Sequence, residues 1–281
     1  MKKVVLAVCV ACGLFAGSQE AAIEAATRGY EVEFIDLVEW VYGKGFLSQG
    51  GAESVEELVA PFDLDGKKVL DIGSGLGGPA ITLAKNHHID VIGIEPQTAL
   101  VEKAQEYLEE TDLQGSVEFI VIEDPSNLKI FEDSSFDYII SKEVILHIPT
   151  DMKEAYFKEI FRVLKPGGEI AILDWTHKSS NYSDDTKKMI ELDGVAYNLI
   201  TPIEYLSTLS KAGFSKISLE DTTQKHIELT NLNLSTIESL REKITTRYDD
   251  ETYNFCMQSW TLQKNAFATR ELATGIFRAR K

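Results

Sequence analysis

Three closely spaced glycines follow a short apolar segment and precede a helical pattern. They are Gly73, Gly75 and Gly77, in the spacing Asp-x-Gly-x-Gly-x-Gly, with Asp71 at the end of the apolar segment. Glycine lets the chain turn tightly from strand to helix and lets its backbone approach a ligand, because no Cβ is in the way. The spacing predicts a loop that binds a nucleotide-like cofactor.

Two acidic residues flank this loop. Asp71 can bind an ammonium group, and Glu95 closes the next apolar run, 20 residues after Gly75. A carboxylate there can accept hydrogen bonds from both hydroxyls of a ribose. S-adenosylmethionine carries an ammonium group and a ribose, so the pair favours that cofactor. A nicotinamide cofactor is disfavoured, because its loop usually has the spacing G-x-G-x-x-G.

His147 is the candidate for acid–base chemistry. It follows a strand-like segment, 136–141, at the carboxyl edge where doubly wound sheets bind ligands. Methyl transfer from S-adenosylmethionine is an in-line displacement that needs a neutral acceptor nitrogen. An imidazole titrates near neutrality, so His147 is suited to accept a proton from that nitrogen.

The elements that must position these residues alternate between strand-like and helical segments. Residues 117–122, 136–141 and 169–175 are strand-like, and residues 152–164 are helical until Lys165-Pro166-Gly167-Gly168 ends the helix before the next strand. Residues 215–219 and 275–279, separated by a polar helical stretch at 229–248, are predicted as edge strands. The pattern predicts an α/β fold with a doubly wound, mostly parallel sheet.

Composition narrows the class of partner. The 281 residues fit one domain with insertions, and 28 Lys and Arg against 45 Asp and Glu give a net charge of −17. Nucleic acid and anionic membranes are disfavoured as partners, because both need basic surfaces. Three cysteines, two of them near the N-terminus, and histidines without ligand spacing predict neither a disulfide framework nor a metal site.

The first 18 residues have the pattern of a secretory signal. Lys2 and Lys3 precede an apolar run at 4–15, and Ala16-Gly17-Ser18 supplies small residues suited to cleavage before Gln19. The run is too short for a stable membrane span, which needs about 20 apolar residues. The need for S-adenosylmethionine favours the cytoplasm instead, and the other reading of the segment is a hydrophobic element docked on the domain.

From about Tyr30 onward the chain resembles the class I S-adenosylmethionine-dependent methyltransferases, and among them the phosphoethanolamine methyltransferases. The segments that carry the resemblance are the glycine loop and residues 39–51, 141–147, 164–168 and 275–281. The resemblance implies a seven-stranded Rossmann-like sheet. It also implies one domain at 19–281, with a helical lid at 19–60, a cofactor-binding core at 61–175, and acceptor-side helices with terminal strands at 176–281.

The resemblance further implies roles for individual residues. Asp71 and Gly73 would hold the methionine part and Glu95 the ribose, while Asp124, or its neighbour Glu123, would lie beside the adenine. Tyr30 would pair with His147 to latch the site. The remaining cofactor-binding candidates are Leu47, Ser48, Gly75, Gly77, Pro96 and Lys142, and the acceptor-binding candidates are Tyr42, Glu143, Trp175, Glu191 and Tyr197.

The chain departs from the resembled family at the acceptor pocket, which in that family grips a phosphate with arginine, lysine and tyrosines. Lys142 stands where an arginine is expected, and an expected tyrosine and arginine fall near Glu191 and Val195. Trp175 replaces another tyrosine, and Tyr197 persists. These substitutions put phosphoethanolamine itself in doubt as the acceptor.

An aromatic and acidic cage of Trp175, Glu143 and Glu191 is the hypothesis that these substitutions motivate, and it suits a cationic amine or imidazole. A thiol acceptor such as a thiohistidine stays open. Two readings outside methyl transfer also remain, namely an NAD-linked oxidoreductase and a catalytically silent nucleotide-binding protein. A small-molecule N-methyltransferase is favoured over both.

Overall fold

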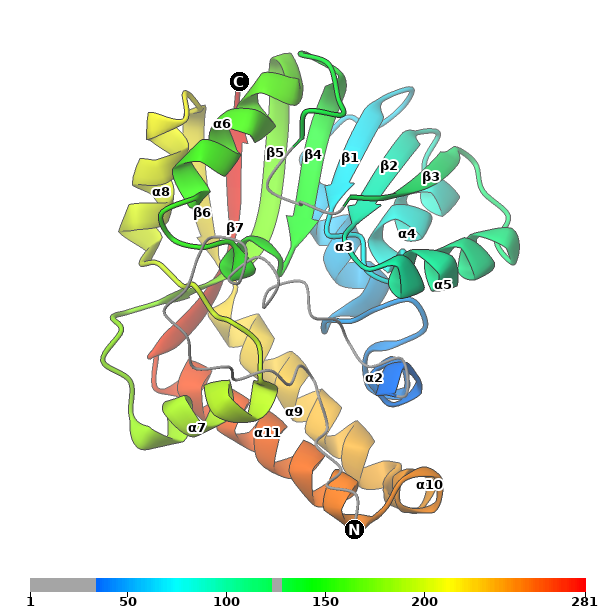
Figure 1. The fold of residues 1–281 in the computed structure, drawn as a ribbon, viewed down its shortest axis with the longest axis vertical. Helices are drawn as coiled ribbons and strands as arrows, with labels where there is room; N and C mark the ends of the chain where they lie inside the picture. The colour runs from blue at the N-terminus through cyan, green and yellow to red at the C-terminus, as the bar shows by residue number, and fades with distance from the viewer. Residues whose placement is uncertain (1–33, 123–127) are drawn as a thin grey trace.

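The computed structural model describes residues 34–122 and 128–281. Their centre is a seven-stranded sheet in the order β3-β2-β1-β4-β5-β7-β6, flanked by helices (Figure 1). The strands are β1 Lys68–Ile72, β2 Asp90–Glu95, β3 Ser116–Val121, β4 Phe136–Lys142, β5 Leu164–His177, β6 Ser215–Asp221 and β7 Leu272–Arg280. The helices are α2 Ile35–Tyr42, α3 Gly51–Val59, α4 Gly78–Asn86, α5 Thr98–Glu109, α6 Lys153–Val163, α7 Asp184–Asp193, α8 Pro202–Lys211, α9 Thr223–Ser239, α10 Arg241–Arg247 and α11 Asp250–Ala268, with a 3₁₀ turn, η2, at Ile145–His147.

Apolar residues cover both faces of the sheet, as a doubly wound fold requires. Strands β1 to β5 are parallel, and successive side chains of β1 point to opposite faces. Val69 packs in the cluster that includes Leu58 of α3 and Leu83 of α4. Leu70 packs in the cluster that includes Phe157 of α6. The predicted α/β fold with a doubly wound, mostly parallel seven-stranded sheet is confirmed.

The terminal strands differ from the sequence prediction. β6 lies at the edge of the sheet, but β7 lies between β5 and β6 and pairs antiparallel with both. The prediction that residues 275–279 form an edge strand is therefore wrong. The strand lies inside the sheet because its side chains are buried on both faces. Ile276 packs in the apolar cluster on one face of the sheet, and Phe277 packs in the cluster on the other face.

The turn predicted at residues 165–168 lies inside the first part of β5. Leu164 pairs with Phe136, and the next pair is Glu169 with Tyr138, so the intervening residues form a bulge. Gly167 has φ 80°, a left-handed conformation that glycine adopts without a steric cost. The helix α6 therefore ends at Val163, and the chain re-enters the sheet within a few residues.

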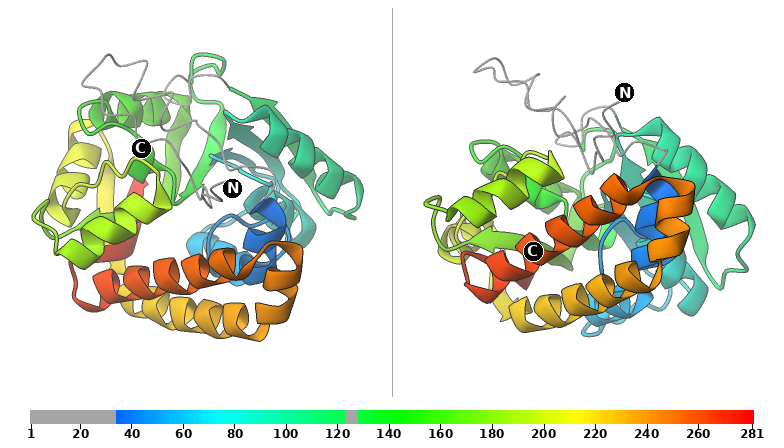
Figure 2. Two further views of the ribbon diagram at one scale, coloured as in Figure 1. Left: turned by 60° about the horizontal axis from the view of Figure 1, so that its bottom comes forward. Right: turned by 90° about the horizontal axis from the view of Figure 1, so that it is seen from below.

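A helical layer formed by α2, α7, α9, α10 and α11 lies below the sheet, on the side toward which the arrow of β4 points (Figure 1). Figure 2 shows α9 and α11 side by side across this layer. The predicted helical stretch 229–248 is divided between α9 and α10. Leu37, Ile237, Ile244 and Trp260 share the apolar core of the layer. Within residues 34–122 and 128–281, no helix is long and apolar enough to cross a membrane.

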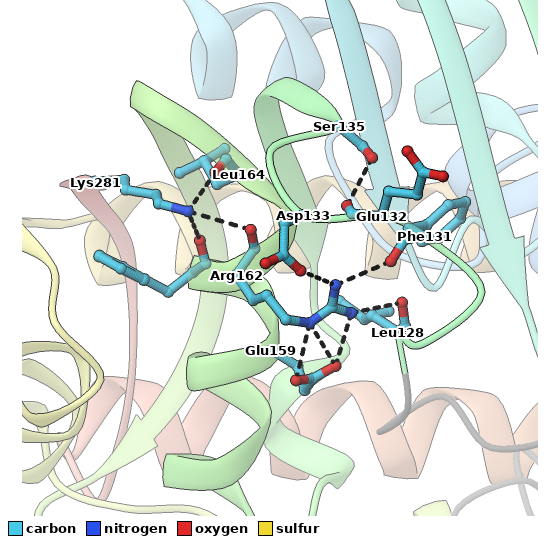
Figure 3. A network of polar contacts seen from close by, with 10 residues as sticks. Leu128, Phe131, Glu132, Asp133, Ser135, Glu159, Arg162, Leu164 and Lys281 are labelled. Carbon is cyan, nitrogen blue, oxygen red and sulfur yellow. Dashed lines mark hydrogen bonds and ion pairs between the residues drawn. The ribbon is translucent and has the colours of Figure 1, made fainter.

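A polar network fixes the opposite, amino-terminal edge of β4 and β5 (Figure 3). The Arg162 guanidinium donates to the carboxylates of Glu159 and Asp133 and to the backbone carbonyls of Leu128 and Phe131. Lys281 Nζ donates to the carbonyls of residues 161, 162 and 164, at the carboxyl end of α6. A cation at that end is favourable, because the unpaired helix carbonyls carry partial negative charge. The network thus stabilises the edge of the sheet that lies opposite its carboxyl edge.

Candidate active site

A cavity of about 200 Å³ lies between the carboxyl edge of the sheet and the helical layer. One part of its wall consists of the glycine loop, the ends of β2 and β4, and a loop at residues 43–50, here called the closing loop. The other part consists of side chains from η2, β5, α9, α11 and the segment that follows α7. The cavity therefore extends from the glycine loop to a group of aromatic side chains, here called the aromatic chamber.

Gly73 and Gly75 line the cavity, as the sequence predicts. Their φ angles are 72° and 52°, and a Cβ at Gly73 would lie 2.4 Å from Val144 Cγ2. Gly77, also predicted to bind the cofactor, does not line the cavity. A Cβ at Gly77 would lie 2.6 Å from Cζ of Phe119, so this glycine is needed where α4 packs against the sheet.

Asp71 and Glu95 are buried on neighbouring strands beside the glycine loop, with exposed fractions of 1% and 6%. Glu95 lines the cavity and accepts hydrogen bonds from Gly75 N (3.1 Å) and Gln97 N (3.2 Å). Asp71 lies behind the cavity wall, and its Oδ2 has no hydrogen-bond partner. The hydroxyl of Ser74, which lines the cavity, also has none.

Desolvation raises the pKa of both carboxyl groups to about 7. For Asp71 the charge of Glu95 adds to the effect of burial, and the Ala80 N–H and Lys142 offset part of it. For Glu95 the N–H groups of Gln97 and Gly75 offset part of the effect. Two buried carboxylates without a full set of partners fit a ligand that brings an ammonium group and hydroxyl donors.

The closing loop is held over the cavity by hydrogen bonds to three other elements. Lys142 Nζ, at the end of β4, donates to Ser48 Oγ (2.5 Å) and to the Gln49 carbonyl (2.8 Å). Gly78 N, at the start of α4, donates to the Gly45 carbonyl (2.9 Å). Gln49 is 5% exposed, and its side chain bonds to α9 through Asn233 Nδ2 (2.9 Å). Leu47, Ser48, Pro96 and Lys142, all predicted as cofactor-binding, line the cavity.

His147 lines the cavity from η2 and is held in one tautomer. Its Nδ1 lies 3.0 Å from the Ala196 carbonyl, which can only accept, so Nδ1 carries the proton and Nε2 keeps a lone pair. Asn198 Nδ2 donates to the His147 carbonyl at 2.9 Å and fixes the turn. Burial lowers the pKa of His147 to about 4, with a small contribution from Lys153, so the expectation that this imidazole titrates near neutrality is wrong and the ring is neutral at pH 7.

A buried charge pair supports η2 from below. Lys153 is 1% exposed and Asp174 is 0% exposed. Lys153 Nζ donates to the Ile145 carbonyl, and Asp174 Oδ1 accepts from Leu146 N at 3.3 Å. Burial lowers the pKa of Lys153 and raises that of Asp174, and each charge partly offsets the effect on the other. The pair therefore positions the turn that carries His147.

Replacing Asp174 by asparagine is expected to lower the free energy of unfolding by about 3 to 5 kcal/mol, because the buried Lys153 ammonium loses its counter-charge. Chemical denaturation followed by circular dichroism measures the change. The control is Asp133→Asn, which removes a carboxylate that is 77% exposed and lies 2.8 Å from Arg162; it should cost less than about 1 kcal/mol. Equal losses in the two variants would contradict the role given to the pair.

Stacked rings form the aromatic chamber. The ring of Tyr197 stacks on Trp175 at 5.4 Å and on His147 at 5.8 Å between centroids. The ring centroids of Tyr42 and Trp260 lie 6.0 Å apart, and both residues also line the cavity. Of the predicted acceptor-binding residues, Tyr42, Glu143, Trp175 and Tyr197 are thus brought together around one space. Glu143 has φ 59°, a conformation that is uncommon for a residue with a side chain and that is often found at functional sites.

Glu191 is exposed and does not line the cavity, so the structure does not bring it together with the other predicted acceptor-binding residues. The acidic residue at the cavity is Asp193, which is 6% exposed. Successive side chains of a helix are rotated by about 100° around its axis, so Glu191 and Asp193, which are two residues apart, lie on nearly opposite faces of α7. The expected kind of side chain is present, but it is carried by a different residue.

Sequence reasoning also missed His226 on α9 and Ser259, Trp260 and Gln263 on α11, which all line the cavity. No local pattern marks them, since they reach the site only through packing of the helical layer. The glycine after Asp193 marks only where α7 ends, and it does not show which face of the helix meets the cavity. Tyr30, Glu123 and Asp124, and the segment 1–18, lie outside the described residues.

The profile of a methyltransferase domain matches residues 69–168. Phosphoethanolamine N-methyltransferase 3 of Arabidopsis thaliana is 32% identical over 265 residues, covering 90% of this chain and 52% of the relative. The chain thus spans about half the length of the plant relatives that it matches. Phosphoethanolamine N-methyltransferase of Plasmodium falciparum is 25% identical and covers 90% of this chain and 93% of the relative.

Among solved structures, phosphoethanolamine N-methyltransferase 2 of Haemonchus contortus superposes with a TM-score of 0.81 at 25% identity. The match covers 92% of this chain and 60% of the other. That structure is a complex with phosphomonomethylethanolamine and S-adenosylhomocysteine.

Proposed function

Since the chain belongs to the class I S-adenosylmethionine-dependent methyltransferases, we propose that it transfers a methyl group from S-adenosylmethionine to the nitrogen of a small-molecule amine. The observation that carries the proposal is the pair of buried carboxylates, Asp71 and Glu95, on either side of a glycine loop whose backbone lines the cavity. S-adenosylmethionine supplies an electrophilic methyl group on a sulfonium when it is bound. Nothing in the cavity favours hydride transfer or a thiol or imidazole acceptor over this reading.

The proposed roles follow from where each side chain lies. Glu95 accepts hydrogen bonds from the ribose hydroxyls, and Asp71 acts behind the loop as the counter-charge to the ammonium group. Gly73 and Gly75 let the backbone reach the ligand, and Leu47 of the closing loop covers it. We propose that the domain consists of a helical lid at 19–60, a cofactor-binding core at 61–175, and acceptor-side helices with terminal strands at 176–281. We also propose a cytoplasmic location, where the methyl donor is made.

Orientation and proton removal are the chain's contributions to the chemical step. The acceptor nitrogen donates an N–H to His147 Nε2, which keeps a lone pair because Nδ1 is bound to Ala196. Trp175 and Tyr197 hold the acceptor in line with the methyl group. Holding two reactants in line can lower the barrier by about 7 to 11 kcal/mol, and a positioned base adds a factor of about 10² to 10⁴. Positioning is therefore the larger contribution.

Binding of S-adenosylhomocysteine is expected to weaken about tenfold or more when the pH falls from 8 to 6. Asp71 and Glu95 have pKa values raised to about 7, and the ligand's ammonium and hydroxyl groups bind the ionised forms. Below pH 7 the carboxyl groups are protonated and must lose protons before binding. Calorimetry at pH 6 in buffers of different ionisation enthalpy should show proton release, which disappears at pH 8. An affinity that is flat over this range would contradict the roles of both carboxylates.

The proposed function is tested by two measurements on the full chain. Isothermal titration calorimetry with S-adenosylhomocysteine should show binding at a single site. Incubation of the protein with methyl-labelled S-adenosylmethionine and a panel of primary, secondary and tertiary amines should transfer label to at least one of them. Absence of binding heat would end the proposal, and NADH binding in its place would favour an oxidoreductase.

A further inference from the structure

The acceptor chamber has a charge pattern that selects the kind of amine, and this inference rests on the proposed function. The chamber is the part of the cavity lined by Glu143, His147, Trp175, Asp193, Tyr197 and Trp260. Two of these six side chains carry carboxylates. Neither histidine of the described wall is cationic at pH 7, because burial lowers the pKa of His147 to about 4 and that of His226 to about 3.

Lys142 is the one lysine among the described residues that line the cavity, and none of those residues is an arginine. Its ammonium already binds Ser48 Oγ and the Gln49 carbonyl of the closing loop. The carboxylates of Asp71 and Glu143 lie close enough to raise its pKa against the effect of burial. The positive charge of Lys142 is therefore balanced within the protein. A phosphate in the chamber would meet the carboxylates of Glu143 and Asp193, and the described part of the wall has no free cation to offset them.

Asp193 is the strongest anionic feature of the chamber. Its two oxygens accept one hydrogen bond each, from Ser259 Oγ (2.9 Å) and from the Tyr197 hydroxyl (2.9 Å), so its position is fixed. Burial raises the pKa of Asp193 to about 6, which leaves it ionised at pH 7.5. Both oxygens retain lone pairs after these bonds are made. A fixed, desolvated carboxylate attracts a cation more strongly than an exposed one does.

The remaining wall is suited to the same kind of group. Trp175, Tyr197 and Trp260 present aromatic rings, and ring faces attract organic cations. Two polar atoms of nine-tenths buried side chains on this wall, His226 Nε2 and Trp260 Nε1, have no hydrogen-bond partner. These atoms indicate a chamber built for a ligand rather than a closed core, since buried polar groups are normally paired, and the Trp260 N–H is a donor that suits an acceptor atom of the ligand and not its ammonium group.

We propose that the acceptor is an unphosphorylated cationic amine, held between the Asp193 and Glu143 carboxylates and the rings of Trp175 and Tyr197. Ammonium acceptors bind as cations and lose one proton before the nitrogen attacks. His147 Nε2 keeps its lone pair, accepts the N–H of the acceptor nitrogen and assists the departure of this proton to water. The phosphate-bearing amines named for the relatives are poor ligands of this chamber.

The experiment compares choline with phosphocholine, which share a trimethylammonium group and differ only in the phosphate. The protein is first saturated with S-adenosylhomocysteine, and each compound is then titrated by calorimetry. Choline is expected to bind at least tenfold more tightly than phosphocholine. Equal affinities, tighter binding of phosphocholine, or no detectable binding of choline would overturn the inference. If S-adenosylhomocysteine itself fails to bind, the proposed function fails instead, so the two failures are distinguished.

A charge variant separates recognition from a purely structural role. Asp193→Asn keeps the side-chain shape, and the ratio of the two affinities should fall at least tenfold toward phosphocholine. A structural defect would weaken both compounds alike and leave the ratio unchanged, which would count against the inference. The matched control is Glu191→Gln, on the exposed face of the same helix, for which both affinities should stay within twofold of the unmodified protein.

Discussion

Replacing Glu95 by glutamine is expected to weaken binding of S-adenosylhomocysteine about a hundredfold or more. The carboxylate already accepts from Gly75 N and Gln97 N, and both oxygens keep lone pairs for the ribose hydroxyls. Glutamine replaces one oxygen by an NH₂ group, which would point a donor at one of these backbone donors. Hydrogen bonds to charged groups contribute about 1.5 to 3 kcal/mol each. The loss of two such bonds is therefore enough to weaken binding about a hundredfold.

Isothermal titration calorimetry measures this change, and Asp90→Asn is its control. Asp90 stands at the opposite end of the same strand β2, where it is exposed and accepts from Ser116 Oγ at 2.6 Å. Its replacement should leave the affinity within twofold. If Glu95→Gln binds as well as the unmodified protein, the carboxylate has a structural role only and the ribose is held elsewhere.

Replacing His147 by alanine is expected to lower kcat by about 10² to 10⁴ with an amine acceptor, while the affinity for S-adenosylhomocysteine stays unchanged. The imidazole is neutral, has its Nε2 lone pair available, and stacks on Tyr197 in the acceptor chamber. The cofactor side of the cavity does not depend on it. Rapid-quench turnover with excess acceptor separates the chemical step from substrate binding.

His88→Ala is the matched control for this variant. His88 is exposed, and its Nδ1 bonds to the Gln114 carbonyl at 3.1 Å, outside the described cavity wall. Its loss should leave kcat unchanged. A drop of only a few-fold in His147→Ala would show that the acceptor loses its proton without a base, as a thiol acceptor can.

The features that the sequence could predict are those that depend on neighbours in the chain. The strand, glycine turn and helix around Gly73 and Gly75 form one local unit, and Glu95 ends the next strand of the same unit. Because neighbouring parallel strands end at the same edge of a sheet, the carboxylates of Asp71 and Glu95 lie at its carboxyl edge, and no information from distant parts of the chain is needed to predict this. His147 is reached by the same rule, because it follows β4 closely.

The features that the sequence could not predict depend on helix phase or on distant packing. Glu191 and Asp193 are both acidic, and only the observed rotation of α7 decides which one enters the cavity. Trp260 lies on α11, whose polar and apolar residues are too mixed to show which face is buried. Gln49 is an ordinary loop residue until α9 brings Asn233 to within 2.9 Å of it.

The place of β7 in the sheet has a consequence for biosynthesis. During translation β6 leaves the ribosome well before residues 272–280, yet β7 is its partner in the sheet. Glu169 of β5 likewise pairs with Arg280, which is synthesised much later. The edges of β5 and β6 that pair with β7 therefore stay unpaired until the end of β7 has been synthesised. Unpaired edges are templates for association with other chains, and distant pairings close slowly. A chain truncated before residue 272 would therefore lack β7 and would be prone to aggregate.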